Sequence, residues 1–212
     1  KEFYDLALKH LKQDGILVQW LPLHLVGPED ARLISRTFKN VFPEFSIWNS
    51  FLTRIVLLVG SREKVVIDKN LFDKRMENLE LKKVAEEMKV FSFLDFADFF
   101  LSDGDHLSGF LESVGEITDD RPLLEFSPVS LLPPMKWETD ESFLNMLRHR
   151  INQKPPVKGL TPQEQDTFDQ NFKLRTAQRL GVFSRRYQGP GIEAFSSRNY
   201  FSGLEAMSAY FD

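Results

Sequence analysis

The sequence predicts an α/β fold in which a mainly parallel sheet ends in one reversed strand and is followed by an α-helical region. Residues 16–21 and 45–49 are short apolar runs separated by a stretch with helical spacing, an order typical of a right-handed crossover between parallel strands. Residues 54–60 follow the second run after only a few residues, too few for a crossover, so these two strands should pair antiparallel. Paired prolines and long helical patterns mark the chain beyond residue 130.

The first helix and strand raise the question of what covers the edge of the sheet. Residues 2–13 predict a helix because Phe3, Leu6 and Leu11 recur at helical spacing. Residues 16–21 are almost continuously apolar, which indicates a strand covered on both faces. A sheet that opened with this strand would have a long hydrophobic edge. We therefore expect earlier strands to precede it in a longer protein; the alternative is that the C-terminal helices of this chain cover the edge.

The remaining elements are mostly helical. A helix is expected over residues 28–41, because Pro28, Glu29 and Asp30 are typical of a helix start. The other expected elements are helices over 71–89, 92–101, 105–114, 139–152, 162–180 and 191–210 and an extended piece at 123–126. The change of pattern along the chain predicts two regions, residues 1–130 as an α/β domain and residues 131–212 as an α-helical region.

The composition excludes several classes of protein. Hydrophobic residues make up 42% and charged residues 27% of the chain, which is typical of a folded globular protein. The net charge of -4 argues against a dedicated nucleic-acid-binding protein. The lack of cysteine excludes disulfides, thiolate zinc sites and a cysteine nucleophile, and it fits a cytoplasmic location. No apolar run approaches the ~20 residues that span a bilayer, so no membrane span is expected in this chain.

Motifs of well-known catalytic and cofactor sites are missing from the sequence. The 11 glycines include no G-x-G-x-x-G and no G-K-S/T, and no serine stands in a G-x-S-x-G motif. The four histidines, at positions 10, 24, 106 and 149, lack the spacing of paired metal ligands. The run Asp103-Gly104-Asp105-His106 has too few ligands for a calcium loop and is interpreted as a helix cap. We predict no metal site and no cofactor site within these residues.

Gln19 is the one candidate for substrate binding. It lies near the carboxyl end of the first predicted strand, and open α/β sheets bind ligands at that end of their strands. Its side chain would then face the substrate cleft. The alternative is a glutamine that satisfies backbone groups at the end of the strand. The neighbouring Trp20 and His24 are expected to lie in the core and in a solvated loop, respectively.

The residues Asp119, Asp120, Arg121 and Pro122 predict a structural turn. Aspartate side chains bond backbone amides in tight turns, and proline fixes the geometry that follows. Arg121 is expected to pair with a carboxylate, because its guanidinium is a fork of donors. The functional alternative is that Asp119 or Asp120 lines a substrate cleft.

Two stretches of the sequence resemble a known family. The segment from Glu2 to Trp20 resembles the helix and strand after the catalytic loop of spermidine synthases and their relatives, where the pattern is E-F-(Y/F), helix, L-K-x-x-G, strand, Q. The stretch from Thr118 to Ser127, T-D-D-R-P-L-L-E-F-S, resembles T-D-D-R-P-x-L-E-(F/Y)-S in the larger bacterial spermidine-synthase-like proteins. The resemblance covers about residues 1–130, and no match is apparent for the tail.

The resemblance implies a fold and a reaction. The fold is that of S-adenosylmethionine-dependent methyltransferases, a Rossmann-like sheet of seven mostly parallel strands with a reversed last strand, and residues 1–130 would be its C-terminal part. The reaction is transfer of an aminopropyl group from decarboxylated S-adenosylmethionine to a polyamine such as putrescine. Decarboxylated S-adenosylmethionine or S-adenosylmethionine is thus implied for the full-length protein. The family's nucleotide-binding residues and catalytic aspartate lie upstream of the matching segment, so none is assigned here and the isolated chain is expected to be inactive.

The resemblance also bears on partners, location and acceptor. Relatives often form dimers, so a homodimer is one expected assembly. The larger relatives are often fused behind an N-terminal multi-span membrane region, which implies membrane attachment of the full-length protein. In place of the family's Tyr-Pro-Ser/Thr-Gly-like loop the chain has residues 49–54, Asn-Ser-Phe-Leu-Thr-Arg, and in place of Gln-Gly-Glu it has Gln19-Trp20-Leu21. The resemblance therefore does not fix putrescine as the acceptor.

Three functions remain open from the sequence. The chain is the C-terminal part of an aminopropyl transferase, an interaction module whose helical tail docks a partner, or a relative of small-molecule methyltransferases that uses S-adenosylmethionine itself. The residues upstream of Lys1 would separate these hypotheses, because an acidic ribose ligand and a paired-aspartate loop there support transfer chemistry.

Overall fold

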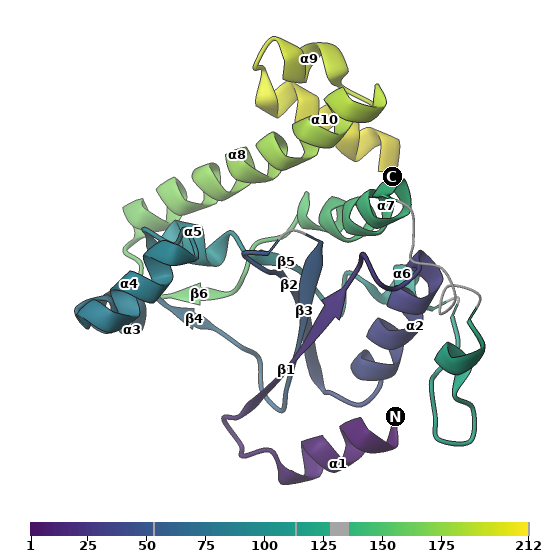
Figure 1. The fold of residues 1–212 in the computed structure, drawn as a ribbon. Helices are drawn as coiled ribbons and strands as arrows, with labels where there is room; N and C mark the ends of the chain where they lie inside the picture. The colour runs from purple at the N-terminus through teal and green to yellow at the C-terminus, as the bar shows by residue number, and fades with distance from the viewer. Residues whose placement is uncertain (53, 113, 128–135, 212) are drawn as a thin grey trace. The chain divides into compact units, whose positions relative to one another are not determined.

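The structure is a computed structural model that describes residues 1–52, 54–112, 114–127 and 136–211. Contacts between residues divide the chain into two compact units (Figure 1). The first unit consists of residues 1–65 and 100–146, and the second consists of residues 66–99 and 147–212. The boundary expected at residue 130 lies outside the described residues.

The first unit contains a four-stranded sheet in the order β1-β3-β2-β5 (Figure 1). The strands are β1 (Ile16–Pro22), β2 (Glu44–Asn49), β3 (Ile55–Ser61) and β5 (Phe100–Asp103). Each neighbouring pair is antiparallel. The three expected strands are confirmed, and β1 and β2 run in the same direction with β3 reversed between them.

The prediction of a mainly parallel sheet is wrong for the described residues, where the pairing is antiparallel throughout this sheet. The short link between β2 and β3 permits only antiparallel pairing. The helical connection places β2 two positions away from β1 in the sheet, and β3 lies between them. The two parallel strands therefore never become neighbours.

Two helices cover one face of this sheet. They are α1 (Glu2–His10) and α2 (Pro28–Lys39), which begins after Gly27 with proline in its first turn, as the sequence predicts. The rings of Tyr4 and Phe38 lie 5.0 Å apart, and those of Phe38 and Phe42 lie 4.6 Å apart. A Cβ atom at Gly60 of β3 would lie 2.4 Å from the Phe42 ring, so glycine is required for this close packing.

The first strand is at the edge of the described sheet, so the prediction of a strand covered on both faces is wrong for these residues. Among the described residues, only β3 pairs with β1. Its side chains Ile16, Val18 and Trp20 are 52%, 47% and 49% exposed. The expectation that Trp20 lies in the core is therefore wrong, because the edge position leaves the outer face of β1 partly uncovered.

The segment after the sheet differs in detail from the sequence prediction. The helix expected over 92–101 ends at Ala97 as α5 (Phe93–Ala97), and β5 follows because Phe100 and Leu101 are buried in the sheet. The Trp48 ring of β2 packs 5.4 Å from the Phe100 ring. The remaining pieces of the first unit are α6 (Ser108–Leu111), a 3-10 helix η1 (Leu123–Phe126) where an extended piece was expected, and α7 (Lys136–Leu147).

The second unit is mostly helical. Its helices are α3 (Lys69–Met76), α4 (Leu79–Glu87), α5, the 3-10 helix η3 (Arg148–Arg150), α8 (Pro162–Tyr187), α9 (Ile192–Ser196) and α10 (Tyr200–Phe211). Two short strands, β4 (Ile67–Asp68) and β6 (Val157–Lys158), pair in parallel. The single helix expected over 71–89 is divided at Asn78, whose side chain accepts hydrogen bonds from the first turn of α4. No helix in the described part of the chain is long and apolar enough to cross a membrane.

The helix α8 is the longest element of the second unit. It begins with a capping box, in which the Thr161 hydroxyl accepts from the Glu164 amide and the Glu164 carboxylate accepts from the Thr161 amide. Its inner face carries Phe168 and Phe172, whose rings stack 5.8 Å apart. The Phe93 ring of α5 lies 5.8 Å from the Phe168 ring, so large rings join these helices.

Candidate functional site

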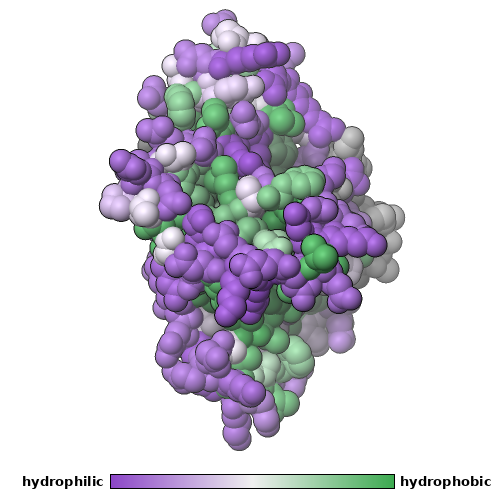
Figure 2. Space-filling view, turned by 90° about the vertical axis from the view of Figure 1, so that its left-hand side faces the viewer, coloured by the Kyte–Doolittle hydropathy of each residue, from purple (hydrophilic) through white to green (hydrophobic). Residues whose placement is uncertain are grey.

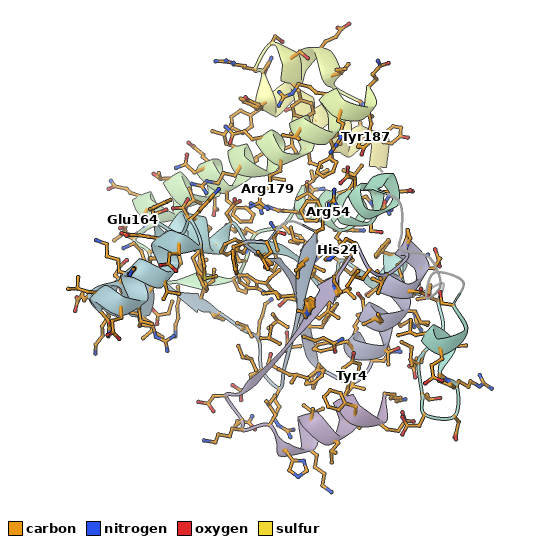
Figure 3. The ribbon with its side chains drawn as sticks, viewed as in Figure 1. Tyr4, His24, Arg54, Glu164, Arg179 and Tyr187 are labelled. Atoms are coloured by element: carbon orange, nitrogen blue, oxygen red, sulfur yellow. The ribbon has the colours of Figure 1, made fainter. Side chains whose placement is uncertain are left out.

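The carboxyl ends of β1 and β2 lie at one edge of the sheet and form the main candidate site. The backbone amide of Leu23, just after β1, donates to the carbonyl of Arg54, just before β3, over 2.9 Å. Nδ1 of His24 lies 3.5 Å from the same carbonyl oxygen (Figure 3). Open α/β sheets bind ligands at this end of parallel strands, and β1 and β2 are such strands although β3 separates them. We call Arg54 and His24, with the loop residues beside them, the strand-end site.

The backbone at Arg54 is strained. Its φ angle is 70°, in the left-handed region that costs a residue with a side chain roughly 1–2 kcal/mol. The other described non-glycine residues with positive φ are Lys89, Gln188 and Arg198, which all follow helix ends, where this conformation is common. Arg54 instead joins two strands. A glycine would adopt this conformation without strain.

The side chains beside Arg54 are mostly apolar and exposed. Leu25, Phe51 and Leu52 are 54%, 53% and 49% exposed. Arg54 is also exposed, and within the described ranges no residue gives its guanidinium a hydrogen bond or an ion pair. The site therefore offers a cation bordered by apolar surface.

The carboxylates that follow β1 are already engaged by neighbours. Glu29 lies 2.9 Å from Arg32 in an ion pair on the first turns of α2. Asp30 accepts a hydrogen bond of 2.6 Å from the Ser127 hydroxyl. Glu29 is thus paired with a cation, whereas Asp30 keeps its negative charge, because a hydroxyl donor does not neutralise a carboxylate.

Gln19, the candidate for substrate binding, has an internal partner. Its side-chain carbonyl accepts a hydrogen bond of 2.6 Å from the Tyr4 hydroxyl, which reaches up from α1 (Figure 3). Burial raises the pKa of Tyr4, and this hydrogen bond to Gln19 partly offsets the rise. Gln19 pairs with Leu58 of β3 on the helix-covered face. The geometry favours a role in docking α1 onto the sheet.

The predicted structural turn is a tight hairpin. The backbone amide of Arg121 donates to the carbonyl of Thr118 over 3.0 Å, and the reverse bond spans 3.4 Å. Asp119 and Asp120 form the exposed tip, and Pro122 follows. The backbone amide of Asp119 donates to the carboxylate of Glu2 over 3.1 Å, which ties the turn to α1.

The expected carboxylate partner of Arg121 is missing from the described residues. The side chain is exposed and takes part in none of the ion pairs found in residues 1–52, 54–112, 114–127 and 136–211. The turn is instead positioned through backbone contacts, such as the bond of 2.9 Å from the Ile117 amide to the Thr37 hydroxyl of α2. Asp119 and Asp120 point to solvent rather than to a cleft between described elements.

A groove of about 720 Å³ lies in the second unit between α3, α5 and the start of α8. Phe72, Phe93 and Phe168 line it, and the ion pair of Lys69 with Asp73, 2.6 Å long, is at its rim. Figure 2 shows apolar surface bordered by hydrophilic residues on the side of the molecule that bears α3 and α4. The sequence did not predict this groove, because its lining comes from segments about 90 residues apart and from no single motif.

A buried ion cluster joins α5 to α8 in the second unit. The Arg150 side chain is 0% exposed and forms an ion pair with the Asp98 carboxylate. It also donates hydrogen bonds to the Thr176 hydroxyl over 2.8 Å and to the Asp98 backbone carbonyl over 2.6 Å. Arg179 binds the other carboxylate oxygen at 2.6 Å. Burial lowers the pKa of Arg150 to about 10 against the attraction of Asp98, so the guanidinium is charged at neutral pH. With its groups paired internally, this cluster has a structural role.

The described residues contain no group of three or more acidic or histidine side chains that could hold a metal ion. The Asp103 carboxylate accepts a hydrogen bond from the His106 backbone amide and lies 2.6 Å from the His106 Nδ1 atom. It thus holds a turn before α6 and is not the predicted helix cap, because α6 begins at Ser108 after Leu107 without a side-chain cap. Comparisons with protein-family models, curated proteins and solved structures give no match to this chain. The residues and their geometry are therefore the evidence for the function of this chain.

Proposed function

We propose that this chain is the C-terminal part of a spermidine-synthase-like transferase. The observation that carries the proposal is the arrangement β1-β3-β2, in which two parallel strands flank a reversed one. It is formed by the residues whose sequence resembles that family, and a reversed last strand is what the resemblance implies. The turn at residues 118–122, which carries the second part of the resemblance, is tied to α1 and α2 of the same unit.

The free edge of β1 supports the same proposal. The seven residues Ile16–Pro22 contain no charged side chain and have proline only at the end, so the edge lacks the usual protection against further pairing. Half-exposed apolar side chains border it. In the proposed transferase, further strands of the sheet pair with this edge and contribute the nucleotide-binding residues.

The proposed reaction forms a carbon–nitrogen bond. The lone pair of a neutral amine attacks the aminopropyl carbon next to the sulfonium sulfur, the carbon–sulfur bond breaks, and methylthioadenosine leaves with the electron pair. The amine loses one proton to a base. In this chain the strand-end site would hold the acceptor, and positioning of the two reactants supplies a large part of the rate enhancement. No residue of the chain is assigned as the base.

The test compares two proteins, the 212-residue chain and the complete gene product that contains it. Each is incubated with decarboxylated S-adenosylmethionine and a panel of amines, and release of methylthioadenosine is measured by chromatography. We expect amine-dependent release by the complete gene product and none by the 212-residue chain. Release by neither protein with any amine, together with no binding of the nucleotide in calorimetry, would reject the proposal.

The groove of the second unit favours a second candidate function, that of an interaction module. Its volume and its aromatic lining are typical of binding sites. A Phe93→Ala variant would remove one ring from the groove, and Phe195→Ala, which truncates a buried ring elsewhere in the same unit, is the matched control. If the module hypothesis holds, partners captured from a lysate are lost with Phe93→Ala and retained with Phe195→Ala, while the complete gene product shows no transferase activity.

A further inference from the structure

The strand-end site carries a cation where a polyamine transferase needs anions. A polyamine is held by carboxylates, whereas Glu29 is ion-paired with Arg32 and Asp30 accepts a hydrogen bond from Ser127. The guanidinium of Arg54 has no partner among the residues that the structure describes. A polycation bound at this place would meet the positive charge of the Arg54 guanidinium.

We propose that Arg54 binds a carboxylate of the acceptor, so that the acceptor is an amine of the amino-acid class and not a simple polyamine. The inference rests on the proposed function, since it names the substrate class of that transferase. A guanidinium presents two parallel N–H donors that match the two oxygens of a carboxylate, which lysine does not.

The backbone conformation of Arg54 is the second observation. Its carbonyl accepts from the Leu23 amide and lies near His24, so the strained residue is held in place by the loop after β1. Strained residues of this kind concentrate at functional sites. The three other left-handed residues of the described structure follow helix ends, where no such explanation is needed.

The apolar surface beside Arg54 completes the site. Leu25, Phe51 and Leu52 are each about half exposed in the loops on either side of it. Methylene groups of an acceptor chain can pack on these side chains while the carboxylate binds Arg54. An acceptor with one carboxylate, an alkyl chain and a terminal amine fits this combination.

The experiment uses pairs of ligands that differ by one carboxylate, ornithine with putrescine and lysine with cadaverine. Calorimetry measures their binding to the complete gene product. We expect the carboxylate-bearing member of at least one pair to bind at least 10-fold more tightly. Arg54→Ala should weaken its binding by about 10- to 100-fold and leave the binding of the diamines unchanged. Arg54→Lys should recover only part of the loss.

The control variant is Arg198→Ala, which removes an exposed arginine that is also left-handed but follows a helix end. It should bind the four ligands like the unmodified protein, and thermal melts should show that all three variants fold. Three results would overturn the inference. The diamines bind more tightly than the amino acids, or no carboxylate ligand binds at all. The third result is that Arg54→Ala weakens the binding of both members of a pair equally. Release of methylthioadenosine tests the proposed function separately. If a diamine supports release, the proposed transferase function stands and the proposal of a carboxylate-bearing acceptor is rejected.

Discussion

Loss of Arg150 should be among the most damaging single changes in the second unit. The side chain is 0% exposed and holds the Asp98 carboxylate, the Asp98 carbonyl and the Thr176 hydroxyl, and its guanidinium stacks 4.0 Å from the centre of the Phe172 ring. Arg150→Ala leaves the carboxylate with less compensation and opens a cavity under the ring. We expect the free energy of unfolding to fall by about 3–5 kcal/mol, the usual cost of breaking a buried ion pair on one side.

Urea denaturation followed by circular dichroism at neutral pH measures this change. The control is the double variant Asp98→Asn with Arg150→Met, which removes both members of the pair and fills the space. Because Arg150→Met leaves the mostly buried carboxylate with only the partly exposed Arg179 and Arg175, this double variant should be more stable than Arg150→Met alone by at least ~1 kcal/mol. A loss below ~1 kcal/mol for Arg150→Ala, or a double variant less stable than Arg150→Met alone, would refute the reasoning.

The same cluster predicts a dependence on pH. Burial raises the pKa of Asp98, but the charges of Arg150 and Arg179 outweigh this and hold the pKa below its ordinary value. A carboxylate with a lowered folded-state pKa stabilises the protein above its unfolded pKa, and the stabilisation is lost as pH falls through the folded value. Stability should therefore decrease below about pH 4. The decrease in unfolding free energy should be smaller in the double variant.

Four further substitutions, one of them a control, test the first unit by thermal melts. Gly60→Ala should destabilise by about 1–3 kcal/mol because the new methyl group meets the Phe42 ring, while Gly109→Ala, which has nothing within 4 Å of the new atom, should be neutral or stabilising; equal effects would contradict this packing. Arg121→Ala should cost under ~1 kcal/mol, since the side chain is exposed, and a larger loss would indicate a buried partner. Tyr4→Phe should cost about 0.5–1.5 kcal/mol by removing the hydrogen bond to Gln19, and no loss would show that this bond is unimportant.

Connection lengths were sufficient to predict the directions of three strands. The few residues between β2 and β3 permit only antiparallel pairing, and the helix between β1 and β2 makes these strands parallel. The position of β3 between β1 and β2 does not follow from connection lengths. The strand β3 can pair antiparallel with β1 as well as with β2, so direction alone does not decide where it lies. The strand β5 was missed because residues 93–101 have the apolar spacing of a helix, and burial against β2 decides the conformation of Phe100 and Leu101.

The candidate sites were less accessible to sequence reasoning. The turn at residues 118–122 was predicted because its residue types favour a turn wherever they occur. The left-handed conformation of Arg54 was not predicted, since arginine has no preference for it and its place at the end of the β2–β3 loop appears only in the folded chain. The partners Arg150 and Asp98 are 52 residues apart, so only the folded chain brings them together.

The most direct test of the central claim is the identity of the nucleoside that the complete gene product releases when it transfers a group to an amine. Chromatography with mass detection separates methylthioadenosine from S-adenosylhomocysteine. The account predicts methylthioadenosine, formed from decarboxylated S-adenosylmethionine in the presence of a carboxylate-bearing amine. Release of S-adenosylhomocysteine from S-adenosylmethionine, with no methylthioadenosine from the decarboxylated cofactor, would contradict it and assign the chain to methyl transfer.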